Sequence, residues 1–239
     1  MALNNGKNLK DIDGLIYKNN GRVISNKERK FLDMNSLDIP AYDLIDLDKY
    51  QDKIKYFTIE TSRGCPHRCD FCYVHSFHKH MWRCKSIPKV IREIKQIMQR
   101  YKIKKFFFCE DNFFVNKPRV IEFGKTLIKE NIKIEIYCYA RADYISKYSS
   151  DELKLISNAG FKYLGIGAES GSQRMLNLIH KGITTTNIIR SAKNCIDHGI
   201  ISVYSFIIGI PGEKKQDLED TIKMYFKLKE ISPKVEING

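Results

Sequence analysis

The stretch that decides the fold reads SIPKVIREIKQIMQRYKIKKFFFCED, residues 86–111. In its first part apolar residues recur three and four positions apart, which predicts an amphipathic helix over 86–101 with Ser86 as its N-cap. These apolar positions are Val90, Ile94, Ile97, Met98 and Tyr101. A short apolar run at 105–109 then predicts a buried strand. A helix followed by a buried strand is the repeating unit of an α/β fold.

The same unit repeats from about residue 56 onward. Apolar or alternating runs predict strands at 56–61, 105–109, 133–139, 162–168, 201–209 and 234–238. Periodic runs between them predict helices at 86–101, 117–131, 149–160, 184–199 and 213–230. Such alternation is typical of parallel strands joined by right-handed helical crossovers. We therefore expect an α/β fold, a partial (β/α)6 TIM-like barrel of parallel strands that stops in or just after its sixth strand.

Polar residues recur just past the carboxyl ends of the predicted strands. They are Cys65, Glu110, Asp111, Arg141, Glu169 and Glu213. In parallel α/β folds these ends share one rim, where barrel enzymes carry their active sites. The sequence contains neither GxGxxG after the first strand nor GxxxxGK[ST], so the common nucleotide-binding open sheets lack support. A barrel with its site on this rim is the expected architecture.

Residues 1–55 show a different pattern. The segment GLIYKNNGRVISN, 14–26, predicts a hairpin with NNG at its turn. The segment LDIPAYDLIDLDKY, 37–50, is acidic and interrupted by proline, which suits a linker docked against the barrel. We expect an N-terminal linker or extension over 1–55 and the barrel over 56–239.

Charge and composition limit the partners and the compartment. The chain has 239 residues, a formal net charge of +13 and seven cysteines. No nucleic-acid-binding motif or basic low-complexity arm accompanies the charge, so we interpret it as a solvated lysine-rich surface, not as a nucleic-acid interface. No apolar run reaches the roughly 18 residues of a membrane span, and the N-terminus has no apolar signal region, which predicts a cytoplasmic protein. Clustered thiols in a reducing compartment more often bind metal or do chemistry than form disulfides.

Three cysteines lie within TSRGCPHRCDFCYVH, residues 61–75, directly after a predicted strand. Cys65, Cys69 and Cys72 have the spacing C-x3-C-x2-C. Three thiolates complete neither a tetrahedral zinc site nor a four-iron cluster. Either one coordination position is left open for a substrate or cofactor, or a fourth ligand comes from elsewhere in the chain. Candidates for that ligand are Cys84, His67, His75, His78 and His80.

The segment GCPHRCDFC, 64–72, has an aromatic residue before its last cysteine and resembles the signature of the radical S-adenosylmethionine (SAM) superfamily. The resemblance implies a 4Fe–4S cluster on Cys65, Cys69 and Cys72, with SAM chelating the fourth iron. It implies an oxygen-sensitive enzyme that cleaves SAM reductively to a 5′-deoxyadenosyl radical, which abstracts hydrogen from an unknown substrate. It also implies a reductant protein such as flavodoxin or ferredoxin. It identifies no catalytic residue.

Segments at the strand ends resemble the SAM-binding motifs of the same superfamily. They are FFFCEDNF (106–113), YARAD (139–143), GIGAESGSQRMLNLIHKGIT (165–184) and FIIGIPGE (206–213). The resemblance implies SAM contacts from Phe71, Glu110, Asp111, Arg141, Glu169, Ser170, Ile208 and Gly209. The acidic pair would meet the amino group, and Arg141 the carboxylate or the radical-forming region. The last segment departs from G-x-I-x-G-x-x-E, because Ser205 holds the first glycine position and Glu213 comes one place late.

The residues before the barrel, 9–50, resemble the segment that links a cobalamin-binding domain to the barrel in one class of the superfamily. The motif D-x-H-x-x-G is absent, so cobalamin enters only if a partner or a separate domain supplies it. Three alternatives remain: a catalytically incomplete cluster-binding remnant, a tRNA methylthiotransferase-like enzyme, and a zinc-containing nucleic-acid-binding protein. Methylation, sulfur insertion, cyclisation and rearrangement all stay open as outcomes.

Overall fold

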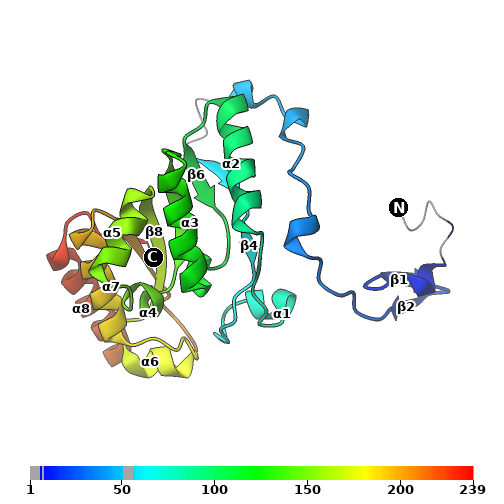
Figure 1. Cartoon of the computed structure of the whole chain (residues 1–239). Coiled ribbons are helices and arrows are strands. Elements are labelled where there is room, and N and C mark those ends of the chain that lie inside the picture. Colours follow the sequence, from blue (N-terminus) through cyan, green and yellow to red (C-terminus); the bar gives the residue numbers. More distant parts are fainter. Residues whose placement is uncertain (1–5, 7, 51–55, 239) are drawn as a thin grey trace.

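A six-stranded parallel sheet forms the centre of the computed structural model, which describes residues 6, 8–50 and 56–238 (Figure 1). Its strands run in chain order across the sheet: β3 (Phe57–Ile59), β6 (Lys105–Phe108), β7 (Glu135–Ala140), β8 (Phe161–Glu169), β9 (Ile201–Phe206) and β10 (Glu236–Asn238). Within the described residues β3 and β10 are the two edges, so the sheet is open. The predicted α/β fold with sequential parallel strands is confirmed.

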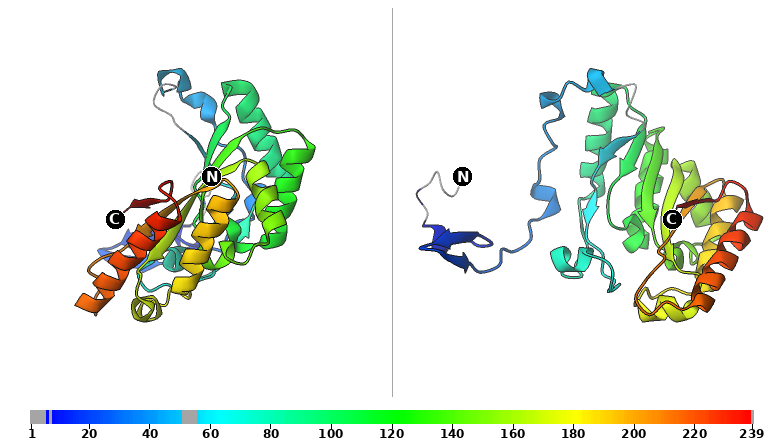
Figure 2. Two further views of the ribbon diagram at one scale, coloured as in Figure 1. Left: turned by 90° about the vertical axis from the view of Figure 1, so that its left-hand side faces the viewer. Right: turned by 180° about the vertical axis from the view of Figure 1, so that it is seen from behind.

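Helices cover one face of this sheet (Figures 1 and 2). They are α2 (Ile87–Tyr101), α3 (Lys117–Lys129), α5 (Ser150–Asn158), α7 (Thr185–Asp197) and α8 (Lys215–Ile231). Strand side chains alternate between the two faces. In β6, Phe106 and Phe108 are fully buried in the core, where Phe108 meets Phe123 of α3, while Phe107 is half-buried on the other face. Within the described part of the chain, no helix combines the length and the apolar character needed to cross a bilayer.

Local sequence signals account for several helix ends. Ser149 and Glu152 form the predicted capping box of α5, with each side chain accepting from the backbone N–H of the other residue. Gly160 and Gly199, which follow α5 and α7, adopt positive φ as the predicted terminators. Ser86 is the N-cap residue of α2, as expected, but its side chain makes no capping hydrogen bond.

The structure differs from the sequence-based expectation in its short elements. The predicted strand 201–209 ends at Phe206, because the chain then turns through Gly209 and Gly212, both at positive φ. Short elements that were not predicted lie near the strand ends: β4 (Ser62–Arg63), α1 (Val74–His78), β5 (Arg83–Cys84), α4 (Ala142–Ile145) and α6 (Gln173–Leu178). Antiparallel pairing of β4 with β5 closes the base of the segment that carries the clustered cysteines.

The N-terminal hairpin is confirmed as β1 (Ile16–Asn19) and β2 (Arg22–Ser25). Its turn places Asn20 and Gly21 at positive φ, as a two-residue hairpin turn requires. The hairpin stands away from the sheet at the end of an extended arm (Figures 1 and 2).

The segment after the hairpin contacts the body of the protein. Lys89 of α2 donates to the carbonyl of Asn35 at 2.9 Å, and the Tyr42 ring lies 4.8 Å from the Phe57 ring of β3. The predicted docking of 37–50 is thus seen at Tyr42. The expected division at residue 55 lies outside the described residues.

Candidate functional site

The cysteine loop, defined here as residues 64–73, lies at the carboxyl ends of the parallel strands. It begins at Gly64, whose φ of +87° suits glycine and whose added Cβ would lie 2.1 Å from the Met81 carbonyl oxygen. Cys69 is buried, Cys65 and Cys72 are partly exposed, and all three are free thiols. The backbone N–H of Cys72 donates to the Cys69 carbonyl at 3.0 Å, which turns the loop between these two ligand candidates.

The acidic pair after β6 holds the start of this loop. Glu110 Oε1 accepts from the Thr61 N–H at 2.7 Å, and Asp111 Oδ2 accepts from the Gly64 N–H at 2.8 Å. Glu110 is only 2% exposed, and its second oxygen, Oε2, is buried without a hydrogen-bond partner. Burial raises the pKa of the Glu110 carboxyl to about 7. The two acids therefore lie on the rim, and one oxygen of each accepts from the backbone at or just before the start of the loop.

A buried ionic network lies beside the β4–β5 pair, at the base of the segment that carries the cysteine loop. Lys85, which follows β5, pairs with Glu93 of α2 at 2.7 Å, and both side chains are nearly inaccessible. Arg119 of α3 donates to Thr61 Oγ1 at 3.1 Å. The interpretation of the positive charge as a solvated lysine-rich surface does not hold for Lys85, and this network was not predicted. Lone charges on an amphipathic helix usually face water, and only the loop packed on α2 buries this pair.

Arg141 follows β7 and reaches the buried cysteine. Its Nη1 donates to Cys69 Sγ at 3.6 Å, its Nη2 to the Lys181 carbonyl at 2.6 Å, and its Nε to Asp143 Oδ1 at 3.0 Å. The arginine is 5% exposed and Cys69 is 7% exposed. The strand-end arginine predicted from sequence is therefore part of the cysteine site.

Glu169 ends β8 and forms a buried ion pair with Lys181, whose Nζ lies 2.6 Å from Oε1. Glu169 has a positive φ of 62°, an uncommon conformation for a residue with a side chain. Lys181 Nζ also lies 5.6 Å from the centroid of the Phe71 ring in the cysteine loop. Lys181 was not predicted as a site residue, although it lies within the segment 165–184 that was singled out.

The remaining predicted cofactor contacts lie in different surroundings. The Ser170 hydroxyl is fully buried and bonds to Thr221 Oγ1 at 3.1 Å, so its expected contact with SAM stays a prediction without direct support here. Ile208 is 64% exposed, and Phe71 is 44% exposed. The Gly209 N–H donates to Glu213 Oε2 at 2.7 Å. Exposed apolar groups such as Phe71 and Ile208 suit the planar face of an adenine.

Burial also shifts the titration of groups beside the first cysteine. It raises the pKa of the Cys65 thiol, although nearby Arg141 acts in the opposite direction. Burial lowers the pKa of His67 to about 4, and the charge of Arg141 adds to this effect. His67 Nε2 lies 2.8 Å from the Tyr144 hydroxyl. His67 is therefore neutral at physiological pH and engaged with a tyrosine.

The donor set fits a multi-iron cluster with SAM. Across residues 6, 8–50 and 56–238, no three His, Cys, Asp or Glu side chains surround a single ion position. A cubane cluster binds each thiolate at a different iron, so its cysteines need not converge on one point. The unpaired Glu110 Oε2 suits the ammonium group of SAM, and Phe71 and Ile208 offer apolar surface. The three cysteines would hold the cluster, and Glu110, Phe71 and Ile208 would hold SAM.

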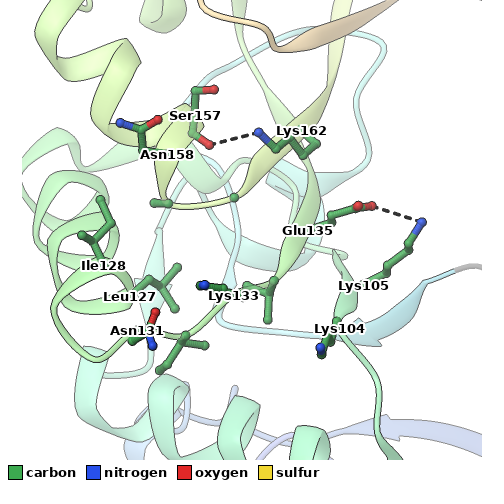
Figure 3. A pocket seen from close by; sticks show the side chains of 14 residues that line it. Lys104, Lys105, Leu127, Ile128, Asn131, Lys133, Glu135, Ser157, Asn158 and Lys162 are labelled. Atoms are coloured by element: carbon green, nitrogen blue, oxygen red, sulfur yellow. Dashed lines mark hydrogen bonds and ion pairs between the residues drawn. The ribbon is translucent and has the colours of Figure 1, made fainter.

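A separate hollow of about 610 Å³ lies at the opposite end of the strands (Figure 3). Its lining includes Lys104, Lys105, Lys133 and Lys162, which lie at or just before the amino ends of β6, β7 and β8. Lys105 pairs there with Glu135 at 3.2 Å. This hollow shares no residue with the cysteine site.

Known proteins resemble this chain over most of its length. Residues 59–225 match the model of the Radical SAM superfamily. An uncharacterized methyltransferase of Pyrococcus horikoshii is 34% identical over 229 residues, covering 95% of this chain and 49% of the relative. The anaerobic magnesium-protoporphyrin IX monomethyl ester cyclase of Synechocystis is 27% identical over 93% of this chain and 44% of that protein. The chain thus spans about half the length of these relatives.

A solved structure shows the same fold. It is a cobalamin-dependent SAM radical enzyme, OxsB, with aqua-cobalamin and SAM bound. The TM-score is 0.82 at 23% identity, covering 93% of this chain and 33% of that one.

Proposed function

We propose that this chain, which belongs to the radical SAM superfamily, holds one 4Fe–4S cluster on Cys65, Cys69 and Cys72 and cleaves SAM reductively. The observation that carries the proposal is the gathering of the cysteine loop, the acidic pair and Arg141 at one rim of the sheet. When bound, the cluster and SAM supply a 5′-deoxyadenosyl radical, formed by one-electron cleavage of a carbon–sulfur bond, that abstracts hydrogen from a substrate.

The protein's own residues bind and orient these groups. We assign the SAM amino group to Glu110 and Asp111, because both carboxyl groups lie at the base of the cysteine loop. Glu169, paired with Lys181, lies at the end of β8, two strands away from the acidic pair that follows β6. Phe71, Ile208 and the Gly209 backbone are assigned to the adenine side. The Ser170 hydroxyl bonds to Thr221 and accepts from the Ser172 N–H, so we assign Ser170 a positioning role next to Glu169.

Methyl transfer is the outcome that we propose for the protein as a whole. The support is the 34% identity to a relative that is named a methyltransferase. Cobalamin, if used, is bound by residues outside this chain or by a separate domain. A low-potential one-electron donor such as flavodoxin or ferredoxin supplies the electron. We propose a cytoplasmic location. The support is the set of free cysteine thiols and the oxygen sensitivity expected of such a cluster, both of which suit a reducing compartment.

Anaerobic reconstitution with iron and sulfide tests the proposal directly. The wild-type chain is expected to bind about four irons, and to form 5′-deoxyadenosine from SAM after reduction. Cys69→Ala should lose most of the cluster and the product. Cys109→Ala removes a thiol outside the cysteine loop and is the matched control, with full iron content expected. A Cys69→Ala protein that keeps both the cluster and SAM cleavage would refute the ligand assignment.

The other outcomes separate the alternatives. An intact cluster with SAM cleavage no faster than buffer would favour a catalytically incomplete remnant. About one zinc per chain with little iron would favour a structural zinc site instead. Sulfur transfer to tRNA by the reconstituted protein would replace methyl transfer as the outcome.

A further inference from the structure

The turn Ile179–Gly182, called here the clamp turn, packs directly on the cysteine loop. The Asp70 N–H donates to the Ile179 carbonyl at 3.1 Å, and the His180 ring nitrogen lies 2.7 Å from the Asp70 carboxylate. Cys69 Sγ lies 4.0 Å from the Lys181 carbonyl oxygen. Loop and turn therefore form one packed unit, although more than a hundred residues separate them in the chain.

The clamp turn and Asp143 together fix the orientation of the Arg141 guanidinium. Nη2 donates to the Lys181 carbonyl at 2.6 Å, and Nε donates to Asp143 at 3.0 Å. These bonds anchor two of the three guanidinium nitrogens of a nearly buried side chain. The third, Nη1, is thereby held 3.6 Å from Cys69 Sγ. Since the guanidinium is planar and rigid, its contact with sulfur follows from the other two bonds.

This contact has an electrostatic consequence for a cluster bound through Cys69. Adding an electron increases the negative charge on the cluster and its thiolates, so a positively charged donor to sulfur stabilises the reduced form more than the oxidised form. Arg141 and Cys69 are both at least nine-tenths buried, so solvent and salt screen the interaction little. Within the described residues, Cys69 is the ligand candidate that receives a charged hydrogen bond to its sulfur.

We propose that Arg141, held by Asp143 and the clamp turn, raises the reduction potential of the cluster through its hydrogen bond to Cys69. This inference rests on the proposed function, because it requires a cluster on Cys69. It differs from the role expected from sequence, in which Arg141 meets the SAM carboxylate or the radical-forming region. The equilibrium concerned is the addition of one electron to the 2+ cluster to give the 1+ cluster, and the electron comes from a low-potential one-electron donor.

The test is a redox titration of the reconstituted 239-residue chain without SAM. Dithionite is the electron donor, and the reduced cluster is followed by electron paramagnetic resonance (EPR). At the wild-type midpoint, Arg141→Gln should lower the ratio of reduced to oxidised cluster by about tenfold, equivalent to 59 mV for one electron. Lys147→Gln is the control. It removes one positive charge from an exposed residue nearby and should leave the ratio within about twofold.

Several results would overturn the inference. Arg141→Gln with full iron content and an unchanged midpoint is one. If the affinity for SAM, measured by equilibrium dialysis, falls instead by about tenfold or more, Arg141 is a SAM ligand. If Arg141→Gln does not take up iron, Arg141→Lys is used instead. Lysine keeps a positive charge beside Asp143 but lacks the planar set of N–H donors that reaches Cys69. A midpoint of Arg141→Lys equal to that of wild type then counts against the inference. A wild-type protein without a four-iron cluster would instead contradict the proposed function.

Discussion

Glu110 is a buried carboxyl group whose protonation is coupled to folding. Its pKa rises from 4.5 to about 7 on burial, so between these values the folded chain binds more protons than the unfolded chain. The free energy of unfolding therefore falls as pH rises through this window, and the stabilisation is complete only below about pH 4.5. Glu110→Gln stays neutral and should exceed wild type in stability by about 3 kcal/mol at pH 8, with little difference near pH 4.5.

Urea denaturation at several pH values, under anaerobic conditions, measures this difference. Glu122→Gln neutralises an exposed carboxylate of α3 and is expected to give a much flatter profile. A Glu110→Gln advantage that is the same at pH 5 and pH 8 would show that burial does not control this carboxyl group.

For single residues, the sequence predicted the place in the fold better than the contacts that the side chain makes. Glu110, Asp111 and Arg141 were expected on the rim, because strand ends are set by local pattern, and the structure places them there. The Arg141 contact with Cys69 and the role of Lys181 were not predicted. Both depend on the clamp turn packing against a loop far away in sequence, which no local pattern encodes.

Two glycines at matching helix–strand junctions differ in their surroundings. Gly199 follows α7 at a φ of +69°, and an added Cβ would meet nothing within 4 Å. Gly160 follows α5 at a φ of +104°, and its added Cβ would lie 2.1 Å from the Ile134 carbonyl oxygen. Gly199→Ala should cost about 1 kcal/mol, from backbone strain alone. Gly160→Ala should cost about 3 kcal/mol or more, because the backbone must also move.

Urea unfolding of the two variants beside wild type checks this difference, and each serves as the control for the other. Equal losses of stability would contradict the close approach of Ile134 to the α5–β8 junction.

At the scale of elements, long periodic segments were predicted and short ones were missed. α2, α3, α5, α7 and α8 carry an apolar stripe over several turns, so their periodicity is visible in sequence. α6 spans six residues and β4 two, which is too short for a period to register. Such elements depend on tertiary contacts. For α6 these include the bonds from Arg174 to Asp217 of α8.

At the scale of the whole molecule, the order of strands follows from alternation alone. Each helix returns the chain beside the strand it left, so the sheet order repeats the chain order from β3 to β10. The candidate cluster ligands could also be located from sequence, since the three cysteines lie within one short loop. Residues that meet across several strands leave no compact motif in the sequence. The aromatic side chains that share the face opposite the helices, Phe107, Tyr137, Tyr139 and Tyr163, illustrate this dispersal.

If Cys65, Cys69 and Cys72 hold a cluster whose fourth iron is open to SAM, the cluster should change its spectrum when SAM binds. The decisive experiment records the EPR spectrum of the reconstituted, reduced protein before and after SAM is added. We predict about four irons per chain, a reduced-cluster signal that changes when SAM binds, and 5′-deoxyadenosine among the products. A full complement of iron with a signal that saturating SAM leaves unchanged would contradict the account.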